Sequence, residues 1–174
     1  MFRCFEKCKS YVINAADGTR SWKQLDLDIT LPKRSTENAA GYDFFAMQDQ
    51  VIPSIWTGIF KKIFRKEHIL PTMVWTGVKA RMLHNEYLAI HNRSSNPWKK
   101  GLLLANGVGV VDSDYYNNPD NDGDIGFAFY NIFPFDVTIH KGDKIGQGVF
   151  HKFLKVDSDY VRRKRTGGFG STGS

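Results

Sequence analysis

The feature that most constrains this chain is a series of short apolar segments, each followed by Gly, Pro, Asn or Asp. Residues 25–31 (LDLDITL) alternate apolar and polar side chains with a period of two, which is typical of a half-buried strand. Similar segments occupy residues 72–82, 87–91, 125–130, 137–139 and 144–150. Many short strands separated by turn residues predict an all-β fold, a barrel or a jelly roll.

One segment, at residues 56–66, has helical periodicity instead. Its apolar side chains recur at a spacing of three and four, and its Lys and Arg side chains take the other face. We expect one short helix, inserted between strands, with its apolar face on the barrel. A basic amphipathic helix can also contact a membrane or nucleic acid, but this one is short for that role.

Length and composition suit one domain. With 174 residues, 41% of them hydrophobic, we expect a single β domain over residues 1–163, including an N-terminal extension of about 24 residues whose structure the pattern leaves uncertain. The net charge of +6 suggests an anionic partner, either a phosphate-rich small molecule or nucleic acid. No apolar run has membrane-spanning length, so we expect a soluble, intracellular protein. Cys4 and Cys8 lack a second Cys/His pair at zinc-finger spacing, which favours reduced thiols.

Residues 164–174 form a glycine-rich tail that cannot build a core. Its glycines, such as Gly168, leave backbone amides free to surround phosphate oxygens, and Phe169 could stack on a flat ring. The known phosphate loops need a strand before the glycines and a helix after them, and here no helix follows. The segment is therefore either an unstructured terminus or a tail that closes over a site built elsewhere.

Residues 106–115 (NGVGVVDSDY) predict a hairpin with a bare backbone. Its amides and carbonyls could bind the edge of a base, and Asn106 could add a side-chain contact. Tyr115 could lie against a sugar. Asp112 is ionised at neutral pH and could accept a proton from water.

Three further positions could bind phosphate or metal. Arg93 lies beside hydroxyl residues directly after an expected strand, which suits a phosphate oxygen. Gln147 on a late strand could fix water or phosphate. Asp43 lies inside an apolar run, where a carboxylate needs a cation, and Mg²⁺ accompanying a nucleoside triphosphate would supply one.

Together, these segments resemble, in order, the five motifs of trimeric dUTPases: residues 40–43 (AGYD), 93–95 (RSS), 109–115 (GVVDSDY), 142–147 (GDKIGQ) and 167–173 (GGFGSTG). The resemblance covers roughly residues 25–174. Details at residues 92–97 and 116–121 resemble the dUTPases of Gram-positive bacteria and their phages.

The resemblance implies a β-jelly-roll (β-clip) homotrimer whose active sites are each assembled from all the subunits. It implies Mg²⁺-assisted hydrolysis of dUTP to dUMP and pyrophosphate in the cytoplasm of a bacterial or phage-infected cell, with no membrane partner and no specific nucleic acid. Asp112 would activate water, and Asp43 would hold Mg²⁺ through water. The implied uracil and deoxyribose contacts are Asn106, Gly109, Val110, Val111, Tyr115, Gly126 and Phe169. The implied phosphate contacts are Arg93, Ser94, Ser95, Gln147, Arg165, Gly168, Ser171 and Thr172.

Some positions depart from the family pattern. The tail begins Lys164-Arg-Thr-Gly-Gly rather than Arg-Gly-x-Gly-Gly, so either Lys164 or Arg165 would hold the terminal phosphate, and we favour Arg165. Ser95 replaces a common glycine. A related dCTP deaminase would need a glutamate near Ala128, which disfavours deamination. Another alternative is a dUTPase scaffold that regulates a protein partner, as a phage-encoded member could.

Overall fold

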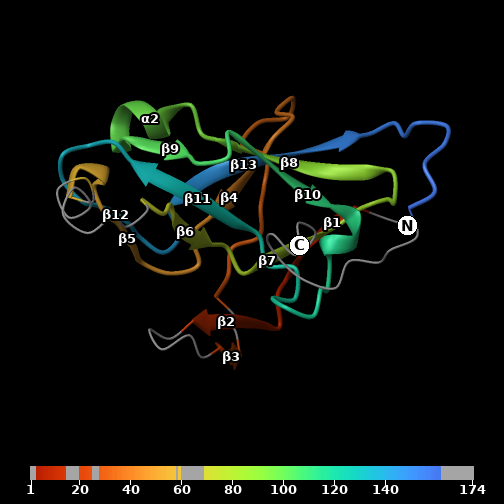
Figure 1. Cartoon of the computed structure of the whole chain (residues 1–174), viewed down its shortest axis with the longest axis horizontal. Helices are drawn as coiled ribbons and strands as arrows, with labels where there is room; N and C mark the ends of the chain where they lie inside the picture. Colours follow the sequence, from red (N-terminus) through yellow and green to blue (C-terminus); the bar gives the residue numbers. More distant parts are fainter. Residues whose placement is uncertain (1–2, 15–19, 25–27, 58, 60–68, 162–174) are drawn as a thin grey trace.

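The computed structural model describes residues 3–14, 20–24, 28–57, 59 and 69–161 (Figure 1). The described chain is built mostly from strands. These are β1 (Cys4–Lys7), β2 (Ser10–Asn14), β3 (Arg20–Gln24), β4 (Tyr42–Phe45), β5 (Gln50–Ile52), β6 (Thr72–Trp75), β7 (Val78–Arg81), β8 (Glu86–Asn92), β9 (Leu102–Leu104), β10 (Val108–Asp112), β11 (Gly126–Asn131), β12 (Val137–Ile139) and β13 (Lys144–Lys152). Short helices occur at α2 (Ser95–Lys100) and at the 3-10 turn η1 (Ser113–Tyr115).

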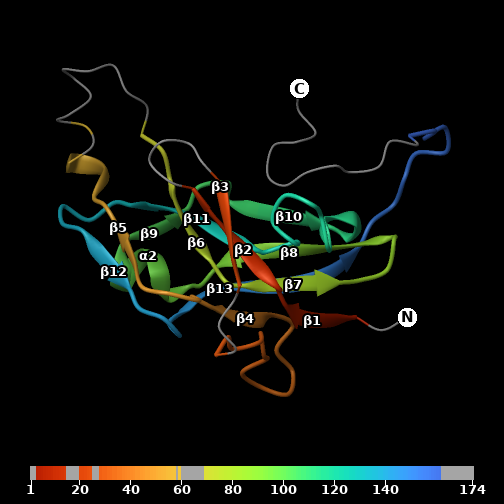
Figure 2. The ribbon, with the colours of Figure 1, turned by 90° about the horizontal axis from the view of Figure 1, so that it is seen from below.

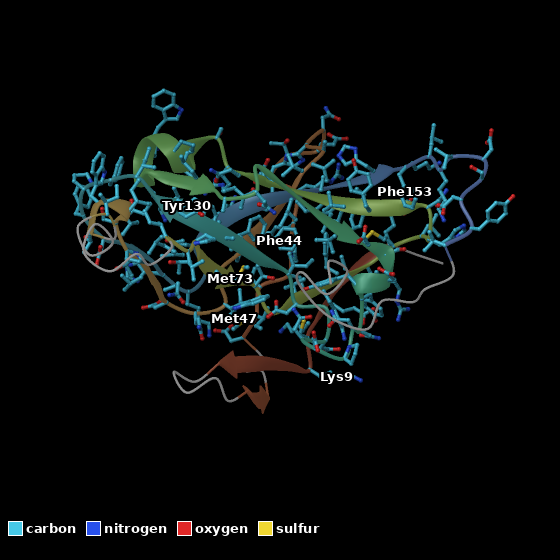
Figure 3. All side chains as sticks on the ribbon, in the orientation of Figure 1. Lys9, Phe44, Met47, Met73, Tyr130 and Phe153 are labelled. Atoms are coloured by element: carbon cyan, nitrogen blue, oxygen red, sulfur yellow. The ribbon has the colours of Figure 1, made fainter. Side chains whose placement is uncertain are left out.

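Two antiparallel sheets enclose the core. One has the strand order β10-β8-β13-β4 and the other β6-β11-β9. Phe44 of the first sheet lies at the centre of the molecule (Figure 3), and its ring centroid is 5.6 Å from that of Phe127 in the second. Gly146 allows this close approach, because a Cβ there would lie 2.0 Å from the Phe127 ring. Burial of large apolar side chains between the sheets is the main stabilising contribution.

Smaller pairings complete the fold. β1 adds to β7, and β12 pairs with β5. β2 and β3 form a two-stranded hairpin, which hangs below the rest of the molecule in Figure 1 and lies nearest the viewer in Figure 2. The N-terminal extension, whose structure the sequence left uncertain, thus contributes three strands.

Two sequence-based expectations about strands were wrong in part. Residues 72–82 form two strands, β6 and β7, because Gly77 between them has a φ of +67°, which no extended strand allows. Residues 28–31 are not in a strand. Ile29 is buried while Asp28 and Thr30 are exposed, so the alternation there reflects burial of one side chain without strand pairing.

The expected helix at residues 56–66 is described only at its start. Residues 55–57 and 59 are helical, and the rest of that segment lies outside the described residues. The Trp56 indole Nε1 donates a hydrogen bond to the carbonyl of Ile132 at 3.0 Å, which ties the start of the helix to the body. Among the described residues, no helix is long and apolar enough to cross a membrane.

Candidate active site

The Asp43 carboxylate is the centre of a polar cluster at one end of the main sheet. Asp43 is 2% exposed. Its Oδ2 accepts hydrogen bonds from Ser35 Oγ at 2.6 Å and from Lys144 Nζ at 2.7 Å. Its Oδ1 accepts one from Gln147 Nε2 at 3.1 Å, and Arg93 Nε lies 4.0 Å away. Three of the residues predicted from sequence, Asp43, Arg93 and Gln147, are therefore brought together.

Strand pairing explains why these residues meet. β13 lies between β4 and β8, and Gln147 is in register with Asp43 on one side and with His91 on the other. Arg93 follows β8 directly, and its Nη1 donates to the carbonyl of Lys144 at 3.4 Å. The register of β13 against β4 shifts between Lys144 and Gly146.

The cluster keeps Asp43 ionised. Burial of the carboxyl acts to raise its pKa, but hydrogen bonds from Lys144, Ser35 and Gln147 outweigh burial and lower the pKa below its ordinary value. An ionised carboxylate held by Lys144 and close to Arg93 leaves a net positive charge at this end of the sheet. That charge suits an anionic ligand.

The loop after β8 carries the predicted phosphate contacts. Ser94 is exposed and forms the N-cap of α2, and Ser95 is its first residue. The buried Asn96 fixes this turn, because its Nδ2 donates to Asn92 Oδ1 and to the carbonyl of Ile145, both at 2.8 Å. Arg93, Ser94 and Ser95 thus lie on a backbone anchored to β13.

The prediction that residues 106–115 form a hairpin was wrong, because the strands on either side of the turn do not pair with each other. A tight turn at Gly107 does link β9 to β10, but β9 pairs with β11 and β10 pairs with β8. Packing against Ile90 requires a glycine at position 109, since a Cβ there would lie 2.4 Å from Cγ1 of Ile90. The exposed Asn106 amide reaches to within 3.2 Å of the same position.

The other predicted base contacts differ in exposure. Val110 on the edge strand β10 is 61% exposed, whereas Val111 is buried. Gly126 is also buried, and a Cβ there would lie 2.6 Å from Sδ of Met73, so the glycine is required for packing. Roles of these residues in base binding stay predictions.

Asp112 and Tyr115 lie at the opposite end of β8 from Arg93. Asp112 is half-buried at the end of β10, in register with Tyr87. Tyr115 follows in η1 and is 4% exposed. Tyr87 lies near the start of β8 and Asn92 at its end, and their separation of five residues corresponds to roughly 16 Å at about 3.3 Å per residue. Asp112 and the Asp43 cluster are therefore separated within one chain.

Sequence reasoning missed two members of the Asp43 cluster. Lys144 lies inside residues 142–147 (GDKIGQ), and a lysine two positions after a glycine turn could have been predicted as a partner for a buried carboxylate. Ser35 carried no such signal. The tail residues Arg165, Gly168, Phe169, Ser171 and Thr172 lie outside the described residues. Among the described residues, no group of three or more His, Cys, Asp or Glu side chains could hold a metal ion.

Comparisons with known proteins agree with the motifs. The dUTPase family model matches residues 28–173. The chain is 46% identical over 154 residues to the deoxyuridine 5'-triphosphate nucleotidohydrolase of Lactococcus lactis subsp. lactis (strain IL1403), covering 87% of this chain and 93% of the relative. It is 32% identical over 156 residues to the protein of the same name from Paramecium bursaria Chlorella virus 1, covering 87% and 95%.

Solved structures give the same fold. The crystal structure of dUTPase from Streptococcus mutans matches with a TM-score of 0.63 and 41% identity, covering 77% of this chain and 97% of that one. A mutant dUTPase from phage phi11 of S. aureus, described with a structural Mg(II) ion, matches with a TM-score of 0.59 and 17% identity, covering 80% and 94%. These matches and the strand content confirm the predicted all-β jelly-roll fold.

Proposed function

Since this chain belongs to the dUTPase family, we propose that it hydrolyses dUTP to dUMP and pyrophosphate. The observation that carries this proposal is the 46% identity to a dUTP nucleotidohydrolase over 93% of that relative's length. All the described catalytic candidates lie within the family match at residues 28–173.

Asp112 is the proposed general base. It is half-buried at the end of β10, where the strand fixes its backbone. It would accept the proton of water as the oxygen attacks the α-phosphorus. Arg93 and Ser94 would hold the phosphates, and Gln147 would orient a phosphate oxygen or water. Positioning and charge neutralisation then supply most of the rate.

Mg²⁺ fits this site only through its water shell. Lys144 already occupies Oδ2 of Asp43, so direct ligation of a metal there would have to displace an ammonium group. A carboxylate oxygen accepts more than one hydrogen bond, and Oδ1 could bind a metal-bound water in addition to Gln147. The ion would neutralise part of the triphosphate charge.

We also propose that the active form is a homotrimer with shared sites. Asp112 and the Asp43 cluster lie at opposite ends of β8, so a site that uses both is most simply completed by a second chain. The segment after β13 supports this arrangement. It extends beyond the body from Phe153 onward (Figures 1 and 3), and its side chains Leu154, Val156 and Tyr160 are 97%, 75% and 81% exposed. Exposed apolar side chains on an extended segment suit contact with another subunit.

Mixing two inactive variants tests the shared site. Asp112→Asn and Arg93→Ala each remove one half of the site, and each should be inactive alone. If the halves come from different chains, unfolding and refolding the two variants together should restore part of the activity. Recovery no greater than either variant refolded alone, or a fully active monomer in light scattering, would refute shared sites.

The assay for the reaction itself is pyrophosphate release from dUTP, dCTP, dTTP and UTP. We expect release from dUTP far above the other three. Deamination of dCTP is disfavoured, because Ala128 in β11 supplies no carboxylate at the place where a deaminase would need one. Ammonia release from dCTP without pyrophosphate release from dUTP would overturn the proposal.

A further inference from the structure

The loop after Tyr115 holds the tyrosine side chain in place. The Tyr115 hydroxyl donates a hydrogen bond to the carbonyl of Asp124 at 3.0 Å and accepts one from Asn121 Nδ2 at 2.7 Å. Both bonds are made by the phenol oxygen of a residue that is only 4% exposed. Because the phenol is fixed at its far end, the ring cannot shift without breaking a buried hydrogen bond.

Asn121 is itself held by the loop. Its Oδ1 accepts hydrogen bonds from Asn118 Nδ2 at 2.7 Å and from the backbone N–H of Gly123 at 3.2 Å. Asn118 Nδ2 also donates to the carbonyl of Tyr115 at 2.9 Å. With its oxygen occupied by two donors, the Asn121 side chain presents its amide nitrogen to the Tyr115 hydroxyl.

A buried lysine anchors this loop to the body. Lys79 of β7 is 2% exposed, and its Nζ donates to Asn117 Oδ1 at 2.5 Å and to Asp122 Oδ1 at 2.9 Å. Asn117 and Asp122 both have a φ of +58°, a conformation that Asn and Asp adopt more readily than most residues. One ammonium group therefore fixes both ends of the loop.

The outer part of the loop contacts β1 and β7 without touching the Tyr115 hydroxyl. The Tyr116 hydroxyl donates to Glu6 Oε2 at 2.7 Å and accepts from Arg81 Nη2 at 2.8 Å. This second phenol provides a matched control, because it lies in the same loop and makes the same kind of bond.

We propose that Asn121 is a specificity-determining positioning residue that selects 2′-deoxyribonucleotides over ribonucleotides by fixing the Tyr115 ring. This inference rests on the proposed function, in which Tyr115 lies against the sugar of dUTP. A ring packed on the sugar excludes a 2′-hydroxyl only if it cannot move away. Asn121 prevents that movement through the buried bond to the phenol oxygen.

The test compares kcat/KM for dUTP and for UTP. Asn121→Ala should lower the dUTP-to-UTP ratio by about 2- to 10-fold, the range expected for the loss of one hydrogen bond. Tyr116→Phe removes a phenol bond elsewhere in the loop and should leave the ratio unchanged. A purely structural role of Asn121 would lower both kcat/KM values equally, and an unchanged ratio overturns the proposal.

A double-mutant cycle shows whether Asn121 acts through the hydroxyl. In a Tyr115→Phe background the bond is already absent, so Asn121→Ala should cause no further change in the ratio. An equal further fall would overturn the proposal. If Asn121→Ala does not fold, Tyr115→Phe carries the test, since it keeps the ring, removes the bonds to both Asn121 and Asp124, and should lower the ratio by at least the same factor.

The parent protein separates this inference from the proposed function. A parent that releases no pyrophosphate from dUTP refutes the function. A parent that is active and prefers dUTP, with a ratio that Asn121→Ala and Tyr115→Phe leave unchanged, refutes only the role of Asn121.

Discussion

Lys144 Nζ lies 2.7 Å from Oδ2 of Asp43, and the two residues are brought together by the pairing of β13 with β4. The lysine side chain is 35% exposed and the carboxylate only 3%. A buried carboxylate therefore has its cation on the solvent side, where an anionic ligand would approach. This arrangement stabilises the fold and supplies positive charge to the site at the same time.

Replacing Lys144 tests the first of these effects. Lys144→Met should lower the free energy of unfolding at neutral pH by about 1 to 3 kcal/mol, because it removes the charged donor of a buried carboxylate and leaves only the neutral donors Ser35 and Gln147. The folded-state pKa of Asp43 lies below its unfolded value, so this stabilisation is present above the unfolded pKa and is lost as pH falls through the folded pKa. Urea unfolding at several pH values should show the difference from the parent shrinking in acid. Lys144→Arg is the control, and a difference that grows in acid would contradict this account.

Asp112→Asn should preserve assembly and nucleotide binding but abolish turnover. The amide has the shape of the carboxylate and cannot accept the proton of water, and loss of a general base costs about a hundredfold or more in rate. Single-turnover hydrolysis of dUTP and binding of a non-hydrolysable analogue measure the two properties separately. Turnover at the parent rate would assign the base to another residue.

Deleting residues 164–174 should leave the fold and the assembly intact while kcat/KM for dUTP falls steeply. The glycines, Phe169 and the hydroxyls of this tail suit closure over a bound nucleotide, and closure excludes competing water. Steady-state kinetics and light scattering of the truncated protein check both parts. Full activity after truncation would identify the tail as an inert terminus.

Asp124 should give stability the opposite pH dependence to Asp43. It is 1% exposed, and burial raises its pKa from 3.8 to about 8. A raised folded-state pKa means that the contribution to stability is fully present below pH 3.8 and is lost as pH rises to about 8. Asp124→Asn keeps an oxygen to accept the bond from the Gly77 N–H, which is 2.8 Å long in the parent. The variant should gain stability relative to the parent as pH rises through this range. A constant difference across the range would show that Asp124 is ionised in the folded protein.

Much of the fold was predictable from the sequence, because strand periodicity is a local property. The apolar segments at residues 87–91, 125–130 and 137–139 became β8, β11 and β12 with nearly the expected bounds. The break at Gly77 was not predicted, because a glycine inside a strand pattern does not reveal the sign of its φ. At Ile29 the opposite error occurred: one buried side chain between two exposed ones gave the alternating pattern of a strand where no strand is present.

The site was predictable in its residue types but not in its arrangement. Asp43, Arg93 and Gln147 were expected near phosphate or metal, and the structure gathers them. That Lys144 holds Asp43 depends on strand register over a separation of 101 residues, which no local pattern encodes. The pairing of β9 and β10 with different strands likewise follows from the packing of two sheets.

The turn between β9 and β10 contains an Asn-Gly pair, Asn106 and Gly107, which is a sequence prone to deamidation. Asn106 is exposed, and the N–H of Gly107 after it, at a φ of +65°, donates a hydrogen bond to the carbonyl of Leu104 at 3.1 Å. In an Asn-Gly pair the backbone nitrogen can attack the preceding side-chain amide, releasing ammonia and leaving a succinimide, and here it can do so only when the bond to Leu104 opens. Hydrolysis of that ring yields aspartate or isoaspartate where the proposed base contact needs an amide, so ageing of the protein would put a negative charge, and in part an extra backbone methylene, into the proposed nucleotide site.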